Sequence, residues 1–369
     1  MTLSDILAEK LGITQNVREK LQGGRGKRGD GNDDRLHIVE PAWERAVDSI
    51  GVSVIILNAG AALPTEKTLA TLYAQSFTDF ETIIVHQDPD DAGLRSVIEE
   101  WPKTKILRSP ADIGFGRACN LAARTATGRY LLFLDANAWL NRTTLGKLVE
   151  ALDSEPGAGI AGPLILNANG SLRSIGMNIN QFGRTRANRE PFEADADLID
   201  NVFFVPGSVL MIKKHLFDSL NGFDELYLRG LEDADLCWRA RLLGKKIVVN
   251  PWSIAYLDQG ADRDTDNYLQ HRNSLRMIIK NFGARKALSG GANFLQATVV
   301  RSFQSLFSLK PRLFYQYWRA LFWNLAMLPD SMRQRRLVQR RRRLNDKSVL
   351  KHIRVDNEKA GDFTSDRAA

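Results

Sequence analysis

Short apolar runs alternate with amphipathic stretches from residue 51 to residue 285. Apolar runs of roughly four to eight residues between polar turns predict buried strands, and a 3.6-residue spacing of apolar positions predicts helices. We expect strands at 51–57, 81–86, 105–108, 130–134, 159–166, 208–212, 246–250 and 252–257. We expect helices at 65–75, 94–100, 114–127, 141–153, 213–220, 232–243 and 268–281. This alternation predicts an α/β fold with a mixed, mostly parallel central sheet.

The apolar run at 130–134 is the expected centre of the sheet. It is apolar on both faces, as central strands of parallel sheets are, and it ends abruptly at Asp135. Ligands of open α/β sheets bind at the carboxyl ends of such strands, so Asp135 and Asn137 are expected at a binding site. The simpler alternative is that both residues only shape the turn before the next helix.

The two ends of the chain differ from this middle part. Residues 1–22 have the pattern of an amphipathic helix, and the glycine-rich, apolar-free stretch 23–34 is typical of a flexible linker. After residue 285, apolar and aromatic positions recur at helical spacing: Phe303, Leu306, Phe307, Phe314, Trp318, Leu321 and Leu325. The expected division is therefore 1–49, 50–285 and 286–369.

Charge sharpens the interpretation of the C-terminal region. The chain has 369 residues, 44% hydrophobic and 25% charged, with a net charge of +8. Residues 330–369 hold twelve Lys and Arg against six Asp and Glu, so most of the excess lies there. An aromatic face beside the arginine run 333–343 is typical of an interfacial helix on an anionic membrane, although these aromatic residues could instead pack on the main domain. No nucleic-acid recognition fold accompanies the basic run, so we expect no nucleic-acid partner.

Cysteine content and the N-terminus bear on location. Two cysteines, Cys119 and Cys237, exclude a disulfide framework and a zinc pattern and fit a reducing compartment. Acidic residues interrupt the first apolar stretch, which is unlike a secretory signal, and no apolar run approaches the roughly 20 residues of a membrane span. We therefore expect a cytoplasmic protein that is peripheral at the inner face of the membrane.

Three acids cluster at a predicted helix start in GFDELYLRGLEDADLCWRAR, residues 222–241: Glu232, Asp233 and Asp235. Acids there complement the helix dipole, which would account for one or two of them. Close carboxylates also raise each other's proton affinity, which suits a general base. A further stretch, IGFGRACN at 113–120, places Gly114 before a helix and Arg117 one turn in, where backbone N–H groups and a cation could meet a phosphate.

The series VSVII, IGFGRACN, GRYLLFLDAN, GPLI, GSVLMIKK, LNGFDE, LEDADLCWRARLLG and HRN resembles the family 2 glycosyltransferases of the GT-A fold, a Rossmann-like nucleotide-binding fold. Within that family it is most similar to rhamnosyltransferase-like enzymes of bacterial polysaccharide assembly. The resemblance covers about residues 50–285. It implies an inverting transfer from a nucleotide-diphosphate sugar, with dTDP-rhamnose among the candidates, to a polysaccharide or lipid-linked glycan.

The resemblance also implies roles for individual residues. Asp233 would be the catalytic base with Glu232 beside it. The donor would be bound by His86 and Asp88 after the second strand, by Asp112, Gly114 and Arg117, and by Asp135 and Asn137. The last two match the pair that holds a divalent cation, Mg or Mn, with the diphosphate.

Three departures from the family pattern put metal binding in doubt. His86 stands where the family usually has Asp, Asn137 where a second acid is common, and Leu257 where a metal-binding His is usual. Two rivals follow: a metal-independent transferase that uses Arg or Lys for the diphosphate, and a degenerate GT-A-fold protein that binds a sugar nucleotide or partner enzyme without turnover. The intact Glu232–Asp233 pair favours an active enzyme.

Overall fold

A computed structural model of the protein describes residues 50–58, 66–87, 97, 99–109, 112–180, 185–189, 198, 202–258 and 267–351. The helix and linker expected within residues 1–49, Asp88, and most of the helix expected at 94–100 lie outside these residues. The strands are β1 (Val52–Asn58), β2 (Phe80–His86), β3 (Lys105–Arg108), β4 (Tyr130–Asp135), β5 (Ala138–Leu140), β6 (Ala158–Asn167), β7 (Leu172–Ser174), β8 (Met177–Ile179), β9 (Thr185–Ala187), β10 (Val209–Lys213) and β11 (Lys246–Leu257).

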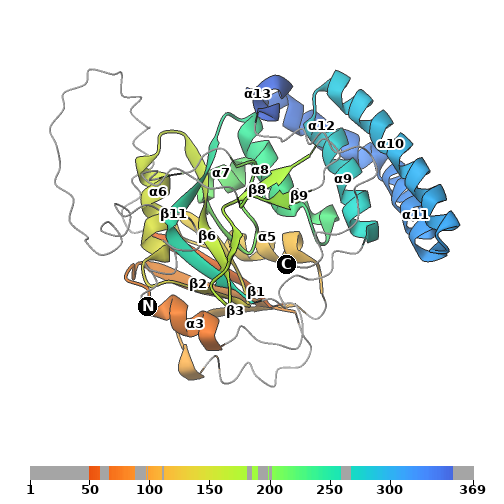
Figure 1. The fold of residues 1–369 in the computed structure, drawn as a ribbon. Helices are drawn as coiled ribbons and strands as arrows, with labels where there is room; N and C mark the ends of the chain where they lie inside the picture. The colour runs from red at the N-terminus through yellow and green to blue at the C-terminus, as the bar shows by residue number, and fades with distance from the viewer. Residues whose placement is uncertain are drawn as a thin grey trace, which may run out of the picture.

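The helices are α3 (Glu66–Tyr73), α5 (Phe115–Thr125), α6 (Thr144–Ser154), α7 (Lys214–Ser219), the 3-10 turn η2 (Glu225–Tyr227), α8 (Glu232–Leu242), α9 (Asn267–Asn281), α10 (Ala284–Phe307), α11 (Pro311–Ala326), α12 (Leu328–Arg341) and α13 (Asp346–Leu350). Figure 1 shows the helices arranged around the central sheet, with α10 and α11 projecting from it.

Within the described residues, nine strands form one sheet in the order β3–β2–β1–β4–β10–β6–β11–β5, with β7 beside β6. Strands β3, β2, β1 and β4 are parallel, and so are β6 and β11. Strand β10 is antiparallel to both of its neighbours, as β5 and β7 are to theirs. The sheet is mixed, as expected, but the expectation of mostly parallel pairing holds only for its first half. Among the described residues, three short strands, β7 to β9, and no helix stand between β6 and β10, so β10 is not placed by the helical crossover that parallel neighbours need.

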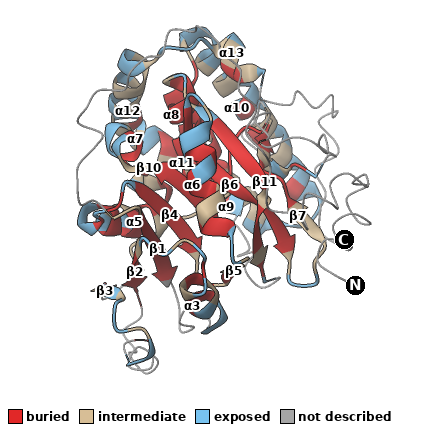
Figure 2. Cartoon of the chain, turned by 90° about the vertical axis from the view of Figure 1, so that its left-hand side faces the viewer, coloured by how far each residue is buried: buried red, intermediate tan, exposed pale blue. Residues whose placement is uncertain are grey.

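Both faces of the sheet are buried, which explains the uninterrupted apolar strands. Along β1, Val54 and Ile56 face a core shared with α3 and α6, whereas Ile55 and Leu57 face a core shared with α5 and α8. Figure 2 shows the buried strands inside a layer of helices whose outer surfaces are exposed.

One continuous strand replaces the two that were expected around Pro251. Strand β11 runs through the proline, and its register against β6 shifts between Asn250 and Ile254. A proline cannot donate to a ladder, and a bulge removes it from the pairing. The side chain of Asn250 accepts from Trp252 N–H at 2.9 Å and closes the bulge.

Short strands were missed by the sequence pattern. Strand β5 lies inside the stretch after Asp135, β7 follows the turn at 169–170, and β9 lies between the strands expected at 159–166 and 208–212. Each has three residues, which is too few to display a period of two. Strand β5 extends the sheet next to β11, directly after the turn that carries Asn137.

The C-terminal helices form a hairpin and then return to the domain. Helices α10 and α11 pack on each other and on α9, and α12 packs on α9. Phe294 of α10 and Val349 of α13 belong to the same core as one face of the sheet. The boundary expected at residue 285 falls in the first turn of α10. No helix in the described part of the chain is long and apolar enough to cross a membrane.

Candidate active site

Asp135 and Asn137 lie at the carboxyl end of β4. Asp135 Oδ1 accepts hydrogen bonds from Asn137 N–H at 2.8 Å and from Asn137 Nδ2 at 3.2 Å. The pair therefore shapes its own turn, the simpler of the two expected roles. These bonds leave Asp135 Oδ2 and Asn137 Oδ1 on the same half-buried turn, where both oxygens could meet a ligand.

Two adjacent residues, Gly207 and Ser208, connect Asp233 to Asp135. Gly207 N–H donates to Asp233 Oδ2 at 2.8 Å, and the carbonyl of Ser208 accepts from Asp135 N–H at 2.8 Å. A Cβ at Gly207 would lie 3.4 Å from both Asp233 Cβ and Phe115 Cζ, so this backbone packs directly against both side chains. The acid at the start of α8 and the acid at the end of β4 thus meet on one turn.

Glu232 and Asp233 differ in their access to solvent. Glu232 is buried and its Oε2 has no hydrogen-bond partner within the described residues, whereas Asp233 is half-buried. Burial, and then the charge of Asp233, raise the pKa of Glu232 to about 8. Burial also raises the pKa of Asp233, against the hydrogen bonds from Gly207 and Ala234. Near neutral pH, Glu232 is therefore mostly protonated, whereas backbone donors on both oxygens of Asp233 favour its charged form.

The start of α5 is already occupied by contacts within the protein. Gly114 N–H donates to Asp112 Oδ1 at 2.9 Å, and Phe115 N–H donates to the carbonyl of Leu228 at 2.9 Å. Gly114 has φ of 82°, and a Cβ there would lie 2.9 Å from the Leu228 carbonyl oxygen. The glycine thus permits the close approach of the turn that contains Leu228. The N–H groups of Gly114 and Phe115 are therefore not among those that a phosphate could meet at this helix start.

Two arginines lie near this junction. Arg117 is exposed and pairs with Glu225 at 3.9 Å. Arg229, which the sequence analysis did not select, bonds Asp112 Oδ2 at 3.0 Å, and its charge acts on Glu232 to lower that pKa. The signal that could have identified Arg229 is its place in LRGL, directly before the Glu232–Asp233 pair.

Strand β2 was expected to carry donor-binding residues at its carboxyl end. His86 ends β2 and is buried at 3% exposure, and its carbonyl accepts from Ser109 N–H at 2.8 Å. Its side chain therefore faces the protein interior, whereas a residue that meets a nucleotide base needs access to the site. Asp88, its expected neighbour in donor binding, lies outside the described residues.

A divalent cation has a limited set of ligands here. Asp135 Oδ2 and Asn137 Oδ1 are hard oxygen donors, which suit Mg or Mn together with phosphate oxygens. Leu257 is a buried apolar residue paired with Ala138, and no group of three His, Cys, Asp or Glu in the described part of the chain could hold a metal. The residues fit a loose site that a diphosphate would complete.

Asn120 was quoted only as part of a motif, yet it joins two halves of the site. Its Oδ1 accepts from Phe223 N–H at 2.8 Å, and its Nδ2 donates to the Phe223 carbonyl at 2.9 Å. Phe115, from the same motif, packs edge-on against Phe223 at 5.3 Å. The blocks GFGRACN and NGFDE therefore form one contact between α5 and the turn that precedes α8.

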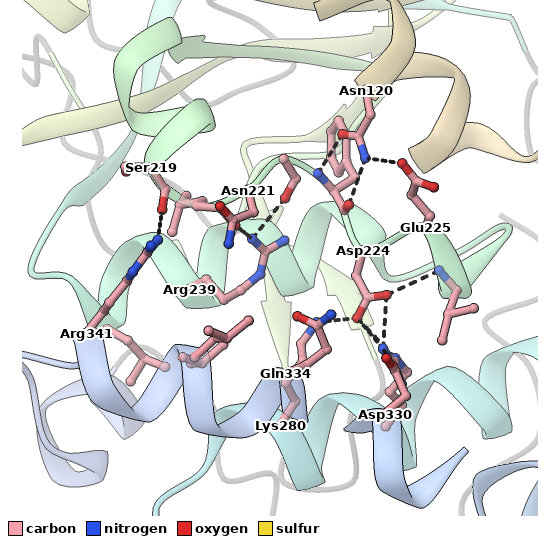
Figure 3. A pocket seen from close by; sticks show the side chains of 18 of the residues that line it. Asn120, Ser219, Asn221, Asp224, Glu225, Arg239, Lys280, Asp330, Gln334 and Arg341 are labelled. Carbon is pink, nitrogen blue, oxygen red and sulfur yellow. Dashed lines mark hydrogen bonds and ion pairs between the residues drawn. The ribbon is translucent and has the colours of Figure 1, made fainter. Parts of the chain in front are cut away.

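A cavity of about 430 Å³ lies away from these acids, between the 219–226 segment, α8, α9 and α12. Figure 3 shows its charged lining, which includes Asp224, Arg239, Lys280 and Asp330. Neither Glu232 nor Asp233 lines it. Its charges mostly pair with each other, so the cavity is a seam between the C-terminal helices and the domain.

Comparison with known proteins relates the chain to one family model and to solved structures of similar fold. Residues 53–220 match the family model described as "Glycosyl transferase family 2". The match ends before α8, so the roles of Glu232 and Asp233 rest on geometry. Among solved structures, GalNAc-T7 with UDP, GalNAc and Mn²⁺ superposes with a TM-score of 0.53 at 16% identity, over 63% of this chain and 49% of that one.

The protein is similar in sequence to several glycosyltransferases, but the sequence identities are low. The N-acetylglucosaminyl-diphospho-decaprenol L-rhamnosyltransferase of Mycobacterium tuberculosis is 22% identical over 220 residues, which cover 51% of this chain and 69% of that enzyme. Rhamnosyltransferase WbbL of Escherichia coli is 24% identical over 215 residues, 53% of this chain and 79% of its own. The uncharacterized protein y4gI of Sinorhizobium fredii is 22% identical over 251 residues, 62% of this chain but only 26% of its own length.

Proposed function

Because the chain carries a glycosyltransferase family 2 domain of the GT-A fold, we propose that it moves a sugar from a nucleotide-diphosphate sugar to a glycan or lipid-linked acceptor, with inversion. The observation that carries this proposal is the junction at Gly207–Ser208, which brings Asp233 to the end of β4 beside Asp135. A partly exposed carboxylate next to a candidate diphosphate site is the arrangement that sugar transfer needs.

Asp233 acts as the general base. A sugar hydroxyl is a poor nucleophile, and a carboxylate within hydrogen-bond reach can take its proton during attack. The hydroxyl oxygen forms a bond to the anomeric carbon as the bond from that carbon to the diphosphate breaks. The proton goes to Asp233, and the electron pair leaves with the diphosphate. Glu232, neutral beside it, avoids a second buried charge at the same place.

The departing diphosphate needs positive charge or a metal. Asp135 and Asn137 would hold a divalent cation, which supplies charge neutralisation for the leaving group when it is bound. Arg229 supports the metal-independent alternative, because its charge acts on Glu232 and its side chain stays 40% exposed while it pairs with Asp112. We prefer it to Arg117 because its charge acts on Glu232, at the acid pair itself.

The relatives suggest the substrate class. Two of them are named as rhamnosyltransferases, one for a decaprenol-linked sugar, so we propose a rhamnosyl donor such as dTDP-rhamnose and a lipid-linked or polysaccharide acceptor of the cell envelope. The test is a panel of nucleotide sugars incubated with the full chain, in which release of nucleoside diphosphate is measured. Release from at least one donor supports the proposal. Binding of a donor without release under any acceptor condition would favour a degenerate protein.

We further propose that the C-terminal hairpin docks on the anionic inner face of the membrane. From α10 to α12 the chain has eleven Lys and Arg and one acid, Asp330. At the hairpin tip, Phe307 and Leu309 are 86% and 89% exposed, with Lys310 and Arg312 beside them. Apolar residues flanked by cations suit the lipid interface. A second copy of the chain is a poorer occupant, because two such basic surfaces repel each other.

The arginine run contributes less to that surface than its sequence indicated. Arg335 donates to the carbonyls of Ile279 and Phe282 at the end of α9, and Arg342 bonds Asp346 at 2.6 Å. Part of the run therefore anchors α12 to the domain, and the apolar tip becomes the main docking element.

A further inference from the structure

The turn that leads into α8 has an unfavourable backbone conformation. Leu228 and Leu231 have φ of 61° and 71°, and Gly230 between them has φ of 85°. Bulky residues rarely adopt positive φ, and each one costs on the order of 1–3 kcal/mol unless surrounding contacts hold it. Glu232 and Asp233 follow at once. Whatever holds this turn therefore also places the two carboxyl groups.

Helix α9 holds the turn with buried side chains. Asn273, which is 0% exposed, donates from Nδ2 to the carbonyls of Tyr227, Arg229 and Gly230 at 3.0, 3.0 and 2.8 Å. Arg272 donates from Nη2 to the carbonyl of Tyr227 at 2.7 Å and to that of the preceding residue at 2.8 Å. Two neighbouring side chains thus satisfy most carbonyls of a turn that cannot pair them in a helix or a sheet.

The same helix fixes the start of the turn. Asp224 accepts from Leu226 N–H at 3.2 Å and pairs with Arg276 at 2.9 Å and with Lys280 at 2.6 Å. Burial opposes ionisation of Asp224, yet Lys280 and Arg276 hold its pKa well below the usual range. In Figure 3, Asp224 and Lys280 face each other beside Asp330 of α12.

The turn contacts both parts of the active site. Its Leu228 carbonyl accepts from Phe115 N–H at the start of α5, and its Arg229 bonds Asp112. The carbonyl of Leu231 accepts from Asp235 N–H at 2.9 Å and begins α8. A shift of the turn would move the base relative to the donor side of the site.

We propose that Asn273 and Arg272 are positioning residues for sugar transfer, which hold the turn 226–231 and thereby aim Asp233. The proposal rests on the proposed function. Arg272 is itself held by α11, since its Cζ lies 4.3 Å from the Trp323 ring centre and its carbonyl accepts from Asn324 Nδ2 at 3.0 Å. The C-terminal helices therefore support the catalytic turn as well as the docking surface.

The test compares Asn273→Ala with a matched control, Gln339→Ala, in the full chain. Gln339 Nε2 also donates to three carbonyls, those of residues 280–282, but at the far end of α9. The readouts are hydrogen exchange of the amides at 226–231, thermal unfolding, and kcat and KM with the donor from the panel, beginning with dTDP-rhamnose. A displaced base lowers kcat. We expect Asn273→Ala to lose about tenfold or more in kcat, with KM within about threefold and faster exchange in the turn. We expect the control, Gln339→Ala, to match the parent in kcat and in hydrogen exchange of the amides at 226–231.

Parent kcat in Asn273→Ala, or unchanged exchange at 226–231, would overturn the proposal. Should that variant fail to fold, Arg272→Lys replaces it, because lysine keeps the charge but loses the forked donors. The same pattern is expected there. If the parent releases nucleoside diphosphate from no donor, the proposed function fails, and the exchange comparison still decides whether α9 holds the turn.

Discussion

Asp233 Oδ2 accepts a hydrogen bond from the backbone N–H of Gly207 at 2.8 Å, and this bond fixes where a base can act in the protein. Gly207 precedes Ser208, whose carbonyl holds the N–H of Asp135. The proposed base and the candidate diphosphate site therefore share one backbone segment. Motion of either acid relative to the other would require this segment to change, which suits a reaction that depends on alignment.

Glu232→Gln should stabilise the protein more as pH rises. The pKa of Glu232 is raised from 4.5 to about 8, so the folded state binds its proton more tightly than the unfolded state does. Between these values the free energy of unfolding falls with rising pH, by up to about 1.4 kcal/mol per unit. Glutamine removes this loss. Thermal unfolding at pH 5 and pH 8.5 should show the variant gaining on the parent at the higher pH.

The control for that measurement is Glu225→Gln, because Glu225 lies on the neighbouring turn with its side chain 41% exposed. Its difference from the parent should depend only weakly on pH. If the melting difference for Glu232→Gln is the same at both pH values, the carboxyl group is not held protonated by burial.

Metal binding should be weak without a nucleoside diphosphate. Asp135 is the one evident charged ligand on its turn, and Leu257 offers no donor atom. Calorimetric titration of Mn²⁺ into the ligand-free protein should give little heat, and addition of dTDP or UDP should produce binding, since phosphate oxygens complete the ligand set. Asn137→Asp adds a carboxylate and should tighten Mn²⁺ by about tenfold, whereas exposed Asn169→Asp should not. Micromolar binding to the free parent would mean that the ligands lie elsewhere.

The sequence predicted the central strands and most helices well, because apolar positions with a clear spacing lie between polar turns. The strand at 105–108 has the expected bounds, and Asp135 and Asp233 both lie at element ends as expected. Contacts between distant segments could not be read in this way. Such contacts bury His86, occupy the N–H of Gly114 and give Asn273 its role. A single sequence does not show which distant segments will come into contact.

Membrane docking should depend on the hairpin tip. Phe307→Ser with Leu309→Ser removes two exposed apolar side chains, which at about 1.5 kcal/mol each amounts to about a hundredfold in affinity for a lipid interface. Most of the double variant should therefore fail to float with vesicles that contain phosphatidylglycerol. Binding of the parent should weaken with salt and with neutral vesicles.

Leu288→Ser is the matched control for docking. Leu288 is also an exposed leucine on α10, at the end of the helix far from the tip. Its flotation should equal that of the parent. Equal flotation of the tip variant and the parent would end the proposal that the tip inserts.

The most direct test of the account is the rate of transfer by Asp233→Asn at saturating donor. Asparagine keeps the size of the side chain and can still accept from Gly207 N–H, but it cannot take a proton at neutral pH. We predict a loss of about a hundredfold or more in kcat with donor affinity within a few-fold of the parent, because general-base contributions are typically of that size. Asp218→Asn, an exposed acid on α7 that pairs with Lys214, should transfer at the parent rate. Transfer by Asp233→Asn at the parent rate would contradict the assignment of the base.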